Sequence, residues 1–400
     1  MAFLDLEIGL SEEDAAVRDM AHQFAAEVLR PAGMELDRLE DPAQVIAPDS
    51  VLWEVFEKYN ATGLGNLMSD TEMDPVAKAR LGAIVNEELS WGDVGLAITL
   101  GLCGFHGPWI QQTGDPELLE RFCSPDNPTI GCWALTEPDH GSDTVAFTES
   151  HFRDASIKAN CVARKDGDDY VIRGQKAAWV SNGTIADVAV LFCAVDQSQG
   201  FAGGGVFLVP LDLPGVERPK PLDKLGQRSL NQGEIYFDDV RIPASYMALG
   251  PELYAIGLEA LLAHANAGMG QLFVGVGRAA YELALAYAKE RVQGGVPIIE
   301  HQSVKSRLFK MFAKVEAARA LARRVAIYNA ANPPQIQYSI ASKTFVTDTA
   351  FEVSNDALQI FGGNGLSREY PIEKVLRDAR ASLLEDGCNE VLGIVGGGRL

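Results

Sequence analysis

Apolar residues recur at helical spacing from Ser11 to about residue 126, and this pattern predicts an α-helical first block. Ser11 stands directly before three acidic residues, which is typical of a helix N-cap and its first turn. From about residue 129 to 243 the pattern changes to short β-branched and aromatic runs, such as 169–172 and 188–192, broken by Gly, Asp and Asn. These runs predict a β-domain.

After residue 243 the glycine and proline signals become sparse, and alanine- and leucine-rich stretches such as 278–291 and 304–329 carry helical spacing again. We therefore predict an α+β fold. It has a helical domain over residues 1–128, a β-domain over 129–245 and a helical bundle over 246–400.

Composition narrows the class of protein. The chain has 400 residues, 47% of them hydrophobic and 22% charged, as in ordinary globular proteins. A formal charge of −21 disfavours nucleic acid and anionic membranes, which bind through clustered Lys and Arg. The six cysteines are scattered without a C-x-x-C pair, so neither a zinc site nor a disulfide framework is indicated. Acidic residues in the N-terminal segment argue against a signal peptide, and Asp187 interrupts the most apolar later stretch. We expect a cytoplasmic protein that does not span a membrane.

The first chemical signal is the segment 132–143, where a β-like run ends in a turn rich in hydroxyls and glycine. Such a turn can offer backbone N–H groups and the hydroxyls of Thr136 and Ser142 to an anionic group. Taken alone, a Pro-Asp-x-Gly-Ser-Asp sequence is more often a plain turn. His140 is interpreted as a turn residue.

Two further motifs have ordinary structural readings when each is taken alone. In 176–183, Trp179 and Ser181 precede an Asn-Gly pair, a pattern that also fits a strand with a core tryptophan and a turn. In 359–365, three glycines follow Gln359 and allow close approach of the backbone to a ligand.

The fourth signal is a pair of carboxylates. Glu385 and Asp386 stand directly before Gly387, in the segment 377–388, which otherwise reads as helical. This pair is our candidate for a catalytic base.

Together these motifs resemble those of the acyl-CoA dehydrogenase family, and the resemblance covers essentially the whole chain. The matching patterns are A-x-T-E-P-x-x-G-S-D at 134–143, K-x-W-I-[ST]-N-G within 176–183 and Q-x-x-G-G-x-G at 359–365. The resemblance implies an N-terminal helical domain, a middle β-barrel domain, a C-terminal four-helix bundle and FAD as cofactor. It also implies that the substrate is an acyl-CoA and that electrons leave to an electron-transferring flavoprotein.

By this resemblance, Thr136 would hydrogen-bond the flavin ring and Ser142 would contact the pyrophosphate. Arg291, Gln302 and Gln359 would reach the FAD of a neighbouring subunit, which requires a homo-oligomer, a dimer or a tetramer. The residues implied to contact FAD are Trp133, Leu135, Thr136, Gly141, Ser142, Trp179, Ser181, Arg291, Gln302, Gln359, Gly362, Gly363, Cys388 and Glu390. The residues implied to contact the substrate are Ser142, Asn266 and Gly387.

The substrate end departs from the family pattern. The usual ending is R-D-A, six residues, then E-G-[TS], and an ungapped match from Arg377 places Asp386 at the glutamate and Cys388 at the Thr/Ser. Asp386 is the better candidate for the base, but its side chain is shorter by about 1.5 Å. Either the loop is shifted or Glu385 acts instead.

Three other departures bear on the site. Asn266 stands where the family usually has an arginine, and Ala265 leaves no carboxylate at the position where a minority of members carry the base. The pair 294–295 is Gly-Gly instead of Phe-Gly, which predicts lower FAD affinity. Ala97 disfavours a dicarboxylic substrate, and Asp93 is interpreted as a helix-edge residue, with a role as an acid or base in a ring-oxidising variant as the alternative.

We therefore expect an enzyme that forms a 2,3-double bond in an acyl thioester. The alternatives are a non-thioester carbon acid, an alicyclic acyl-CoA, an acyl group bound to a carrier protein, or a non-catalytic flavoprotein subunit in a complex.

Overall fold

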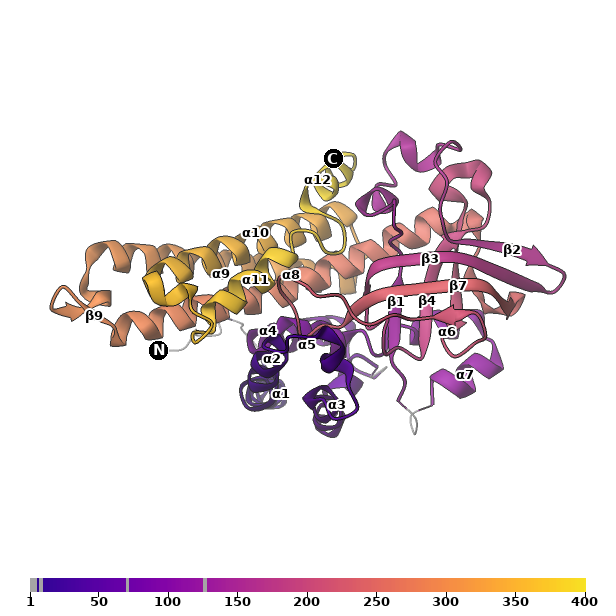
Figure 1. The fold of residues 1–400 in the computed structure, drawn as a ribbon. Helices are drawn as coiled ribbons and strands as arrows, with labels where there is room; N and C mark the ends of the chain where they lie inside the picture. The colour runs from indigo at the N-terminus through magenta and orange to yellow at the C-terminus, as the bar shows by residue number, and fades with distance from the viewer. Residues whose placement is uncertain (1–5, 7–9, 70–71, 125–127) are drawn as a thin grey trace.

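The computed structural model describes residue 6 and residues 10–69, 72–124 and 128–400, and its helical, β and helical blocks follow one another as predicted (Figure 1). The first block contains α1 (Glu12–Phe24), α2 (Arg30–Asp37), α3 (Val51–Thr62), α4 (Pro75–Gly92), α5 (Val94–Gly101), α6 (Gly107–Thr113) and α7 (Pro116–Phe122). The predicted N-cap is confirmed. The hydroxyl of Ser11 accepts the N–H of Asp14 at 3.0 Å, and the Asp14 carboxylate accepts the N–H of Ser11 at 3.1 Å.

The β-domain is built on one mixed sheet of eight strands. Its hydrogen-bonded order is β6-β7-β3-β2-β4-β5-β8, and β1 pairs in parallel with β4. The strands are β1 (Gly131–Ala134), β2 (Val162–Asp166), β3 (Asp169–Ser181), β4 (Val188–Ala194), β5 (Gly204–Pro210), β6 (Val216–Glu217), β7 (Gln232–Pro243) and β8 (Met247–Leu249).

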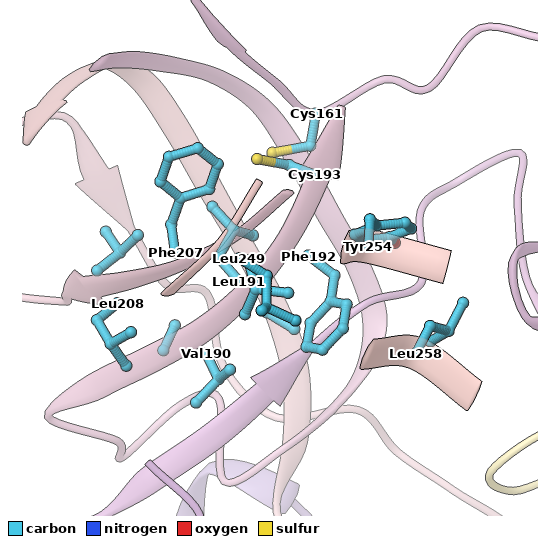
Figure 2. Packing of buried hydrophobic residues seen from close by; sticks show 14 of the residues in the cluster. Cys161, Val190, Leu191, Phe192, Cys193, Phe207, Leu208, Leu249, Tyr254 and Leu258 are labelled. Atoms are coloured by element: carbon cyan, nitrogen blue, oxygen red, sulfur yellow. The ribbon is translucent and has the colours of Figure 1, made fainter. Parts of the chain in front are cut away.

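The centre of the sheet is covered on both faces. Every residue of β4 and β5 is buried, which explains why the sequence reads there as continuous apolar runs without alternation. Figure 2 shows Tyr254 and Leu258, at the start of α8, packed beside Phe192 of β4. The rings of Phe192 and Tyr254 are 6.0 Å apart in an edge arrangement. The bundle is thereby fastened to the sheet through one end of α8.

The C-terminal bundle is organised around α8 (Pro251–Glu290), whose 40 residues extend for about 60 Å. It packs with α9 (Gln302–Ala331), α10 (Ile336–Phe361) and α11 (Ile372–Ala381), and α12 (Asn389–Gly397) ends the chain. Between α8 and α9, β9 (Val292–Gln293) and β10 (Val296–Pro297) form a hairpin at the end of the molecule opposite the sheet (Figure 1). Gly294 and Gly295 form its turn with φ of 68° and 87°, a conformation that favours glycine at both positions.

The helical interpretation of residues 377–388 is correct only for the first part. The helix α11 ends at Ala381, and α12 begins at Asn389, so both candidate carboxylates lie in the loop between them. Asp386 has φ of 50° and Gly387 has φ of 96°, both in the left-handed region that interrupts a right-handed helix. The sequence pattern did not show this break because Ala381, Leu383 and Leu384 continue the helical spacing.

None of the helices within the described ranges combines the length and the apolar character needed to cross a bilayer.

Candidate functional site

The first two motifs lie side by side. The hydroxyl of Thr136 donates to the carbonyl of Ala177 at 3.0 Å, and the N–H of Ala177 donates to the carbonyl of Thr136 at 2.9 Å. The neighbouring residues Glu137 and Lys176 form a buried ion pair at 2.7 Å. The turn after β1 is therefore fixed to the strand that carries Trp179.

Trp179 is 59% exposed, an unusual position for a tryptophan on a central strand. The pairing of β3 with β7 is irregular between Lys176 and Val180, and Ala178 has φ of 54°. This bulge turns the local backbone and presents the indole outward. Two residues further, the hydroxyl of Ser181 accepts a hydrogen bond from the Gln232 amide at 3.0 Å.

The turn that follows β1 also reaches the C-terminal loop. The hydroxyl of Ser142 accepts the N–H of Cys388 at 2.9 Å. Leu135 and Gly141 lie in this same turn, and Glu390 is in the first turn of α12. These contacts bring Thr136, Ser142 and Cys388 together, next to the part of β3 that carries Trp179 and directly after β1, which carries Trp133.

The two candidate carboxylates differ in their partners. Glu385 accepts a hydrogen bond from the Gln227 amide at 3.0 Å. For the Asp386 carboxylate, the described part of the chain supplies neither a hydrogen bond nor an ion pair, and its backbone N–H is likewise without an acceptor there. Asp386 therefore has a free acceptor and a free donor.

Burial changes the acidity of both groups. Burial raises the pKa of Glu385 to about 7, with repulsion from Asp386 adding to the effect, whereas the Gln227 hydrogen bond and the ammonium groups of Lys224 and Lys343 oppose it. Burial also raises the pKa of Asp386 above its usual range, and the positive charge of Lys343 acts in the opposite direction.

A buried lysine from α10 holds the backbone of this loop. Lys343 is fully buried, and its Nζ donates to the carbonyls of Ser382 at 2.8 Å and Gly387 at 3.0 Å. On α8, the amide of Asn266 donates to the carbonyl of Leu262 at 3.0 Å and reaches the carbonyl of Asp386 at 3.5 Å. The site thus contains a positive charge although Asn266 stands at the position where the family pattern has an arginine.

A chain of buried polar groups runs from α5 to the loop. The Asp93 carboxylate caps α5 through the N–H of Leu96 at 2.9 Å and pairs with Lys374 at 2.6 Å. Lys374 also pairs with Asp378 at 2.6 Å, and the Asp378 carboxylate accepts the N–H of Gln227. Both oxygens of Asp93 are engaged, as fits a helix-edge residue with a structural role.

The remaining predicted cofactor residues are gathered elsewhere. Arg291 directly follows α8 and Gln302 begins α9, both at the end of the bundle that carries β9 (Figure 1). The glycine-containing loop, residues 362–365, contacts this end of the bundle through Asn364. The Asn364 amide donates to the hydroxyl of Tyr287 on α8 at 2.9 Å. Gln359, Gly362 and Gly363 are exposed there, as are Arg291 and Gln302. Within one chain, this cluster and Trp179 do not form a single site.

Comparison with known proteins gives three family matches in order along the chain. They are the acyl-CoA dehydrogenase N-terminal domain at residues 11–125, the middle domain at 132–240 and the C-terminal domain at 258–399. The chain belongs to the acyl-CoA dehydrogenase family. It is 31% identical to the short-chain specific acyl-CoA dehydrogenase of Megasphaera elsdenii, over 95% of this chain and 96% of that protein.

Solved structures agree with this assignment. The butyryl-CoA dehydrogenase of Megasphaera elsdenii matches with a TM-score of 0.81 and 29% identity, covering 98% of this chain and 99% of that one. A chain in a structure of the electron transferring flavoprotein of Acidaminococcus fermentans matches with a TM-score of 0.81 and 28% identity, covering 98% of each chain. The protein is an FAD-dependent oxidoreductase that acts on acyl-CoA.

The residues present fit the cofactor of an acyl-CoA dehydrogenase. The exposed indole of Trp179 offers a flat apolar face to a flavin ring. The indole N–H of Trp133 is buried and finds no acceptor among the residues described, so it is available to a ligand atom. The individual contacts to FAD stay predictions, as do the domain boundaries at 128 and 245.

Sequence reasoning missed the residues that position the loop, namely Lys343, Gln227 and Lys374. A signal for Lys343 was present, because it falls on the helical face formed by Ile336, Ile340 and Val346, all of them buried. A lysine is almost never fully buried on such a face unless it has polar partners. Gln227 carries no comparable signal, because its contacts are with residues about 150 positions away.

Proposed function

We propose that this acyl-CoA dehydrogenase forms the 2,3-double bond of a short-chain acyl-CoA, with Asp386 as the catalytic base. The observation that carries the proposal is the free carboxylate of Asp386 in a loop that the Ser142–Cys388 hydrogen bond connects to the flavin motifs. A short acyl chain is supported by the names of the relatives from Megasphaera elsdenii.

The chemistry requires two hydrogens to leave adjacent carbons. The thioester carbonyl acidifies the α-proton, and the Asp386 carboxylate accepts it, while the β-hydrogen leaves with its electron pair as a hydride and the C–C double bond forms. FAD, when bound, supplies the acceptor for that hydride. The unengaged N–H of Asp386 is a suitable donor for the carbonyl oxygen as charge develops on it.

Glu385 is the less suitable base. Its carboxylate already accepts the Gln227 amide, and Gln227 in turn is fixed to Asp378. A proton acceptor in such a contact must give up a hydrogen bond before it can approach a substrate carbon. This favours Asp386, which the ungapped alignment also indicated.

The site is completed by a second copy of the chain. Arg291, Gln302 and Gln359 are exposed at the far end of the bundle, where they have no role toward the flavin motifs of their own chain. Residues at that end would reach a neighbour's FAD, so that the enzyme is active as a dimer or tetramer.

An electron-transferring flavoprotein is proposed as the electron acceptor, supported by the structural match to a chain from Acidaminococcus fermentans. The protein's cytoplasmic location remains a prediction.

The test of the proposal is anaerobic titration of the FAD-loaded protein with butyryl-CoA, longer straight-chain, branched and alicyclic acyl-CoAs. Loss of the visible flavin absorbance with formation of the 2-enoyl-CoA is the expected result. If no thioester reduces the flavin, the proposed reaction is wrong. If only a thioester of acyl carrier protein reduces the flavin, the proposed dehydrogenation is correct but the acyl group is carried by that protein instead of CoA.

A further inference from the structure

The buried amine of Lys343 makes three hydrogen bonds to one short segment. Its Nζ donates to the Ser382 carbonyl at 2.8 Å, the Gly387 carbonyl at 3.0 Å and the Asn389 side-chain oxygen at 2.7 Å. An ammonium group has three N–H donors, so all of them are used. These acceptors lie before and after the two carboxylates, and Lys343 therefore spans the loop from both sides.

The backbone that Lys343 holds is one that needs support. Asp386 has φ of 50°, a left-handed conformation that is unfavourable for a residue with a Cβ, and Gly387 follows with φ of 96°. Such conformations persist when surrounding contacts over-determine them. The contacts here include the three bonds of Lys343, the Cys388–Ser142 bond and the approach of the Asn266 amide to the Asp386 carbonyl. The Asn389 N–H also donates to the Leu383 carbonyl at 3.0 Å within the loop, and the Gln227 amide donates to Glu385.

Lys343 is also placed at a cost to the fold. It is fully buried, and the described residues give it carbonyl and amide oxygens as partners rather than a carboxylate within ion-pair distance. Burying an ammonium without a counter-ion is unfavourable, and an apolar side chain of the same length would avoid the penalty. A lysine at this position therefore indicates a function beyond packing.

We propose, on the basis of the function proposed above, that Lys343 is the positioning residue for Asp386. Its hydrogen bonds hold loop 382–389 in the conformation that leaves the Asp386 carboxylate and N–H without partners among the described residues, and its positive charge lies where it favours the ionised form of that carboxylate.

The charged groups near Lys343 are consistent with this role. On the loop they are the carboxylates of Asp386 and Glu385, and on its own helix the carboxylate of Asp348. The Cys388 side chain is a further titratable neighbour on the loop. Burial lowers the pKa of Lys343 to about 8, although these neighbours raise it. Below that pH the amine is charged and opposes the effect of burial on Asp386. The ammonium group of Lys224 acts on Glu385.

The experiment compares Lys343→Met with Lys224→Met. Lys224 is a matched control because burial also lowers its pKa to about 8, while its Nζ donates to the Leu230 carbonyl at 2.7 Å and to Gln232 at 2.8 Å, outside the loop. The first readout is hydrogen exchange of residues 382–389 in the FAD-loaded protein without substrate. The second is the pH dependence of anaerobic flavin reduction.

Lys343→Met is expected to speed exchange in this loop and to slow reduction at neutral pH by about 100-fold, because a reacting group displaced by roughly 1 Å costs that much. In this variant, the rising limb, which is the part of the pH profile where the rate of flavin reduction rises, should move to higher pH. Loss of the positive charge makes Asp386 harder to ionise. Lys224→Met should leave the exchange of residues 382–389 unchanged and should move that limb less than Lys343→Met does, because the Lys224 charge acts on Glu385 and the Lys343 charge acts on Asp386. Unchanged exchange, or an unmoved limb, in Lys343→Met overturns the proposal.

Lys343→Arg keeps the charge and alters the geometry, and it serves if the methionine variant does not fold. The expected result is a slower reaction with the rising limb at the wild-type position. Wild-type rate and exchange in this variant would contradict a positioning role. Failure of every acyl-CoA to reduce the wild-type flavin would instead refute the proposed function, and loop exchange would still report on Lys343.

Discussion

The amide nitrogen of Gln227 lies 3.0 Å from a carboxylate oxygen of Glu385, and it also reaches the Asp378 carbonyl at 3.3 Å. This relationship distinguishes two neighbouring acids that the sequence could not separate. Glu385 is held by the segment that precedes β7, whereas Asp386, one residue later, points its carboxylate to no partner within the described chain.

Asp386→Asn should abolish most thioester-driven flavin reduction while FAD stays bound. The amide has nearly the same volume but cannot accept the α-proton, and loss of a general base typically costs about 10²–10⁴-fold. Glu385→Gln is the control and should cost far less, because glutamine can still accept the Gln227 hydrogen bond. Stopped-flow reduction at fixed pH measures both variants. If Glu385→Gln slows reduction far more than Asp386→Asn does, the base is Glu385. If both variants reduce the flavin at the normal rate, neither carboxylate is the base.

Glu385 should make the fold less stable as the pH rises from about 4.5 to about 7. Burial raises the pKa of Glu385 from 4.5 to about 7, so within this window the folded state holds a proton that the unfolded state has released. The free energy of unfolding therefore falls with rising pH. Glu385→Gln removes this titration. The change in melting temperature from wild type to variant should therefore be more positive at pH 8 than at pH 4.5, by about 1 °C or more. Equal effects at both values would contradict the raised pKa.

Trp179→Ala should weaken FAD binding by about tenfold or more, because aromatic stacking contributes about 0.5–1.5 kcal/mol beyond the apolar area that is buried. Trp91→Ala is the contrasting variant. Trp91 is buried, its indole N–H donates to Glu282 at 2.8 Å, and the guanidinium of Arg30 lies 3.5 Å from its ring. Its loss should reduce stability by about 3–5 kcal/mol and leave the FAD dissociation constant of the folded protein unchanged. Equal effects on FAD would show that the flavin face is misplaced.

Arg291→Ala should release FAD, with an increase in its dissociation constant of about 10–100-fold, as expected for hydrogen bonds to a charged group. Lys289→Ala is a matched control, since Lys289 is also an exposed cation at the end of α8. The oligomeric state of each variant is measured in parallel by analytical ultracentrifugation. A monomer that binds FAD with undiminished affinity would refute the shared site.

The sequence predicted those parts of the fold that depend on local patterns. The Ser11 cap, the strand at Val188–Ala194 and the long helix ending near Arg291 all follow from residues close together in the chain. The three-residue strand β8 could not be predicted in this way, because Met247–Leu249 is too short for a period to be recognised.

The site was predictable as a set of motifs but not as a geometry. Residues 377–388 carry helical spacing, and the left-handed backbone of Asp386 depends on contacts with Lys343, more than 40 positions earlier. The choice between Glu385 and Asp386 depends on Gln227, from a different domain. Such long-range hydrogen bonds leave no trace in a single sequence, because neither partner's position restricts the other locally.

The length of α8 has a genetic consequence. It begins against the sheet with Tyr254 and ends, about 60 Å away, beside Arg291. Under the proposed shared site, a single chain therefore contributes Asp386 and Arg291 to different sites. An oligomer of Asp386→Asn chains alone and an oligomer of Arg291→Ala chains alone should each have low activity, the first because it has no base and the second because it binds FAD weakly. In a mixed dimer, one site combines both defects and the other receives Asp386 from one chain and Arg291 from its partner. Co-expression of these two alleles should therefore show intragenic complementation.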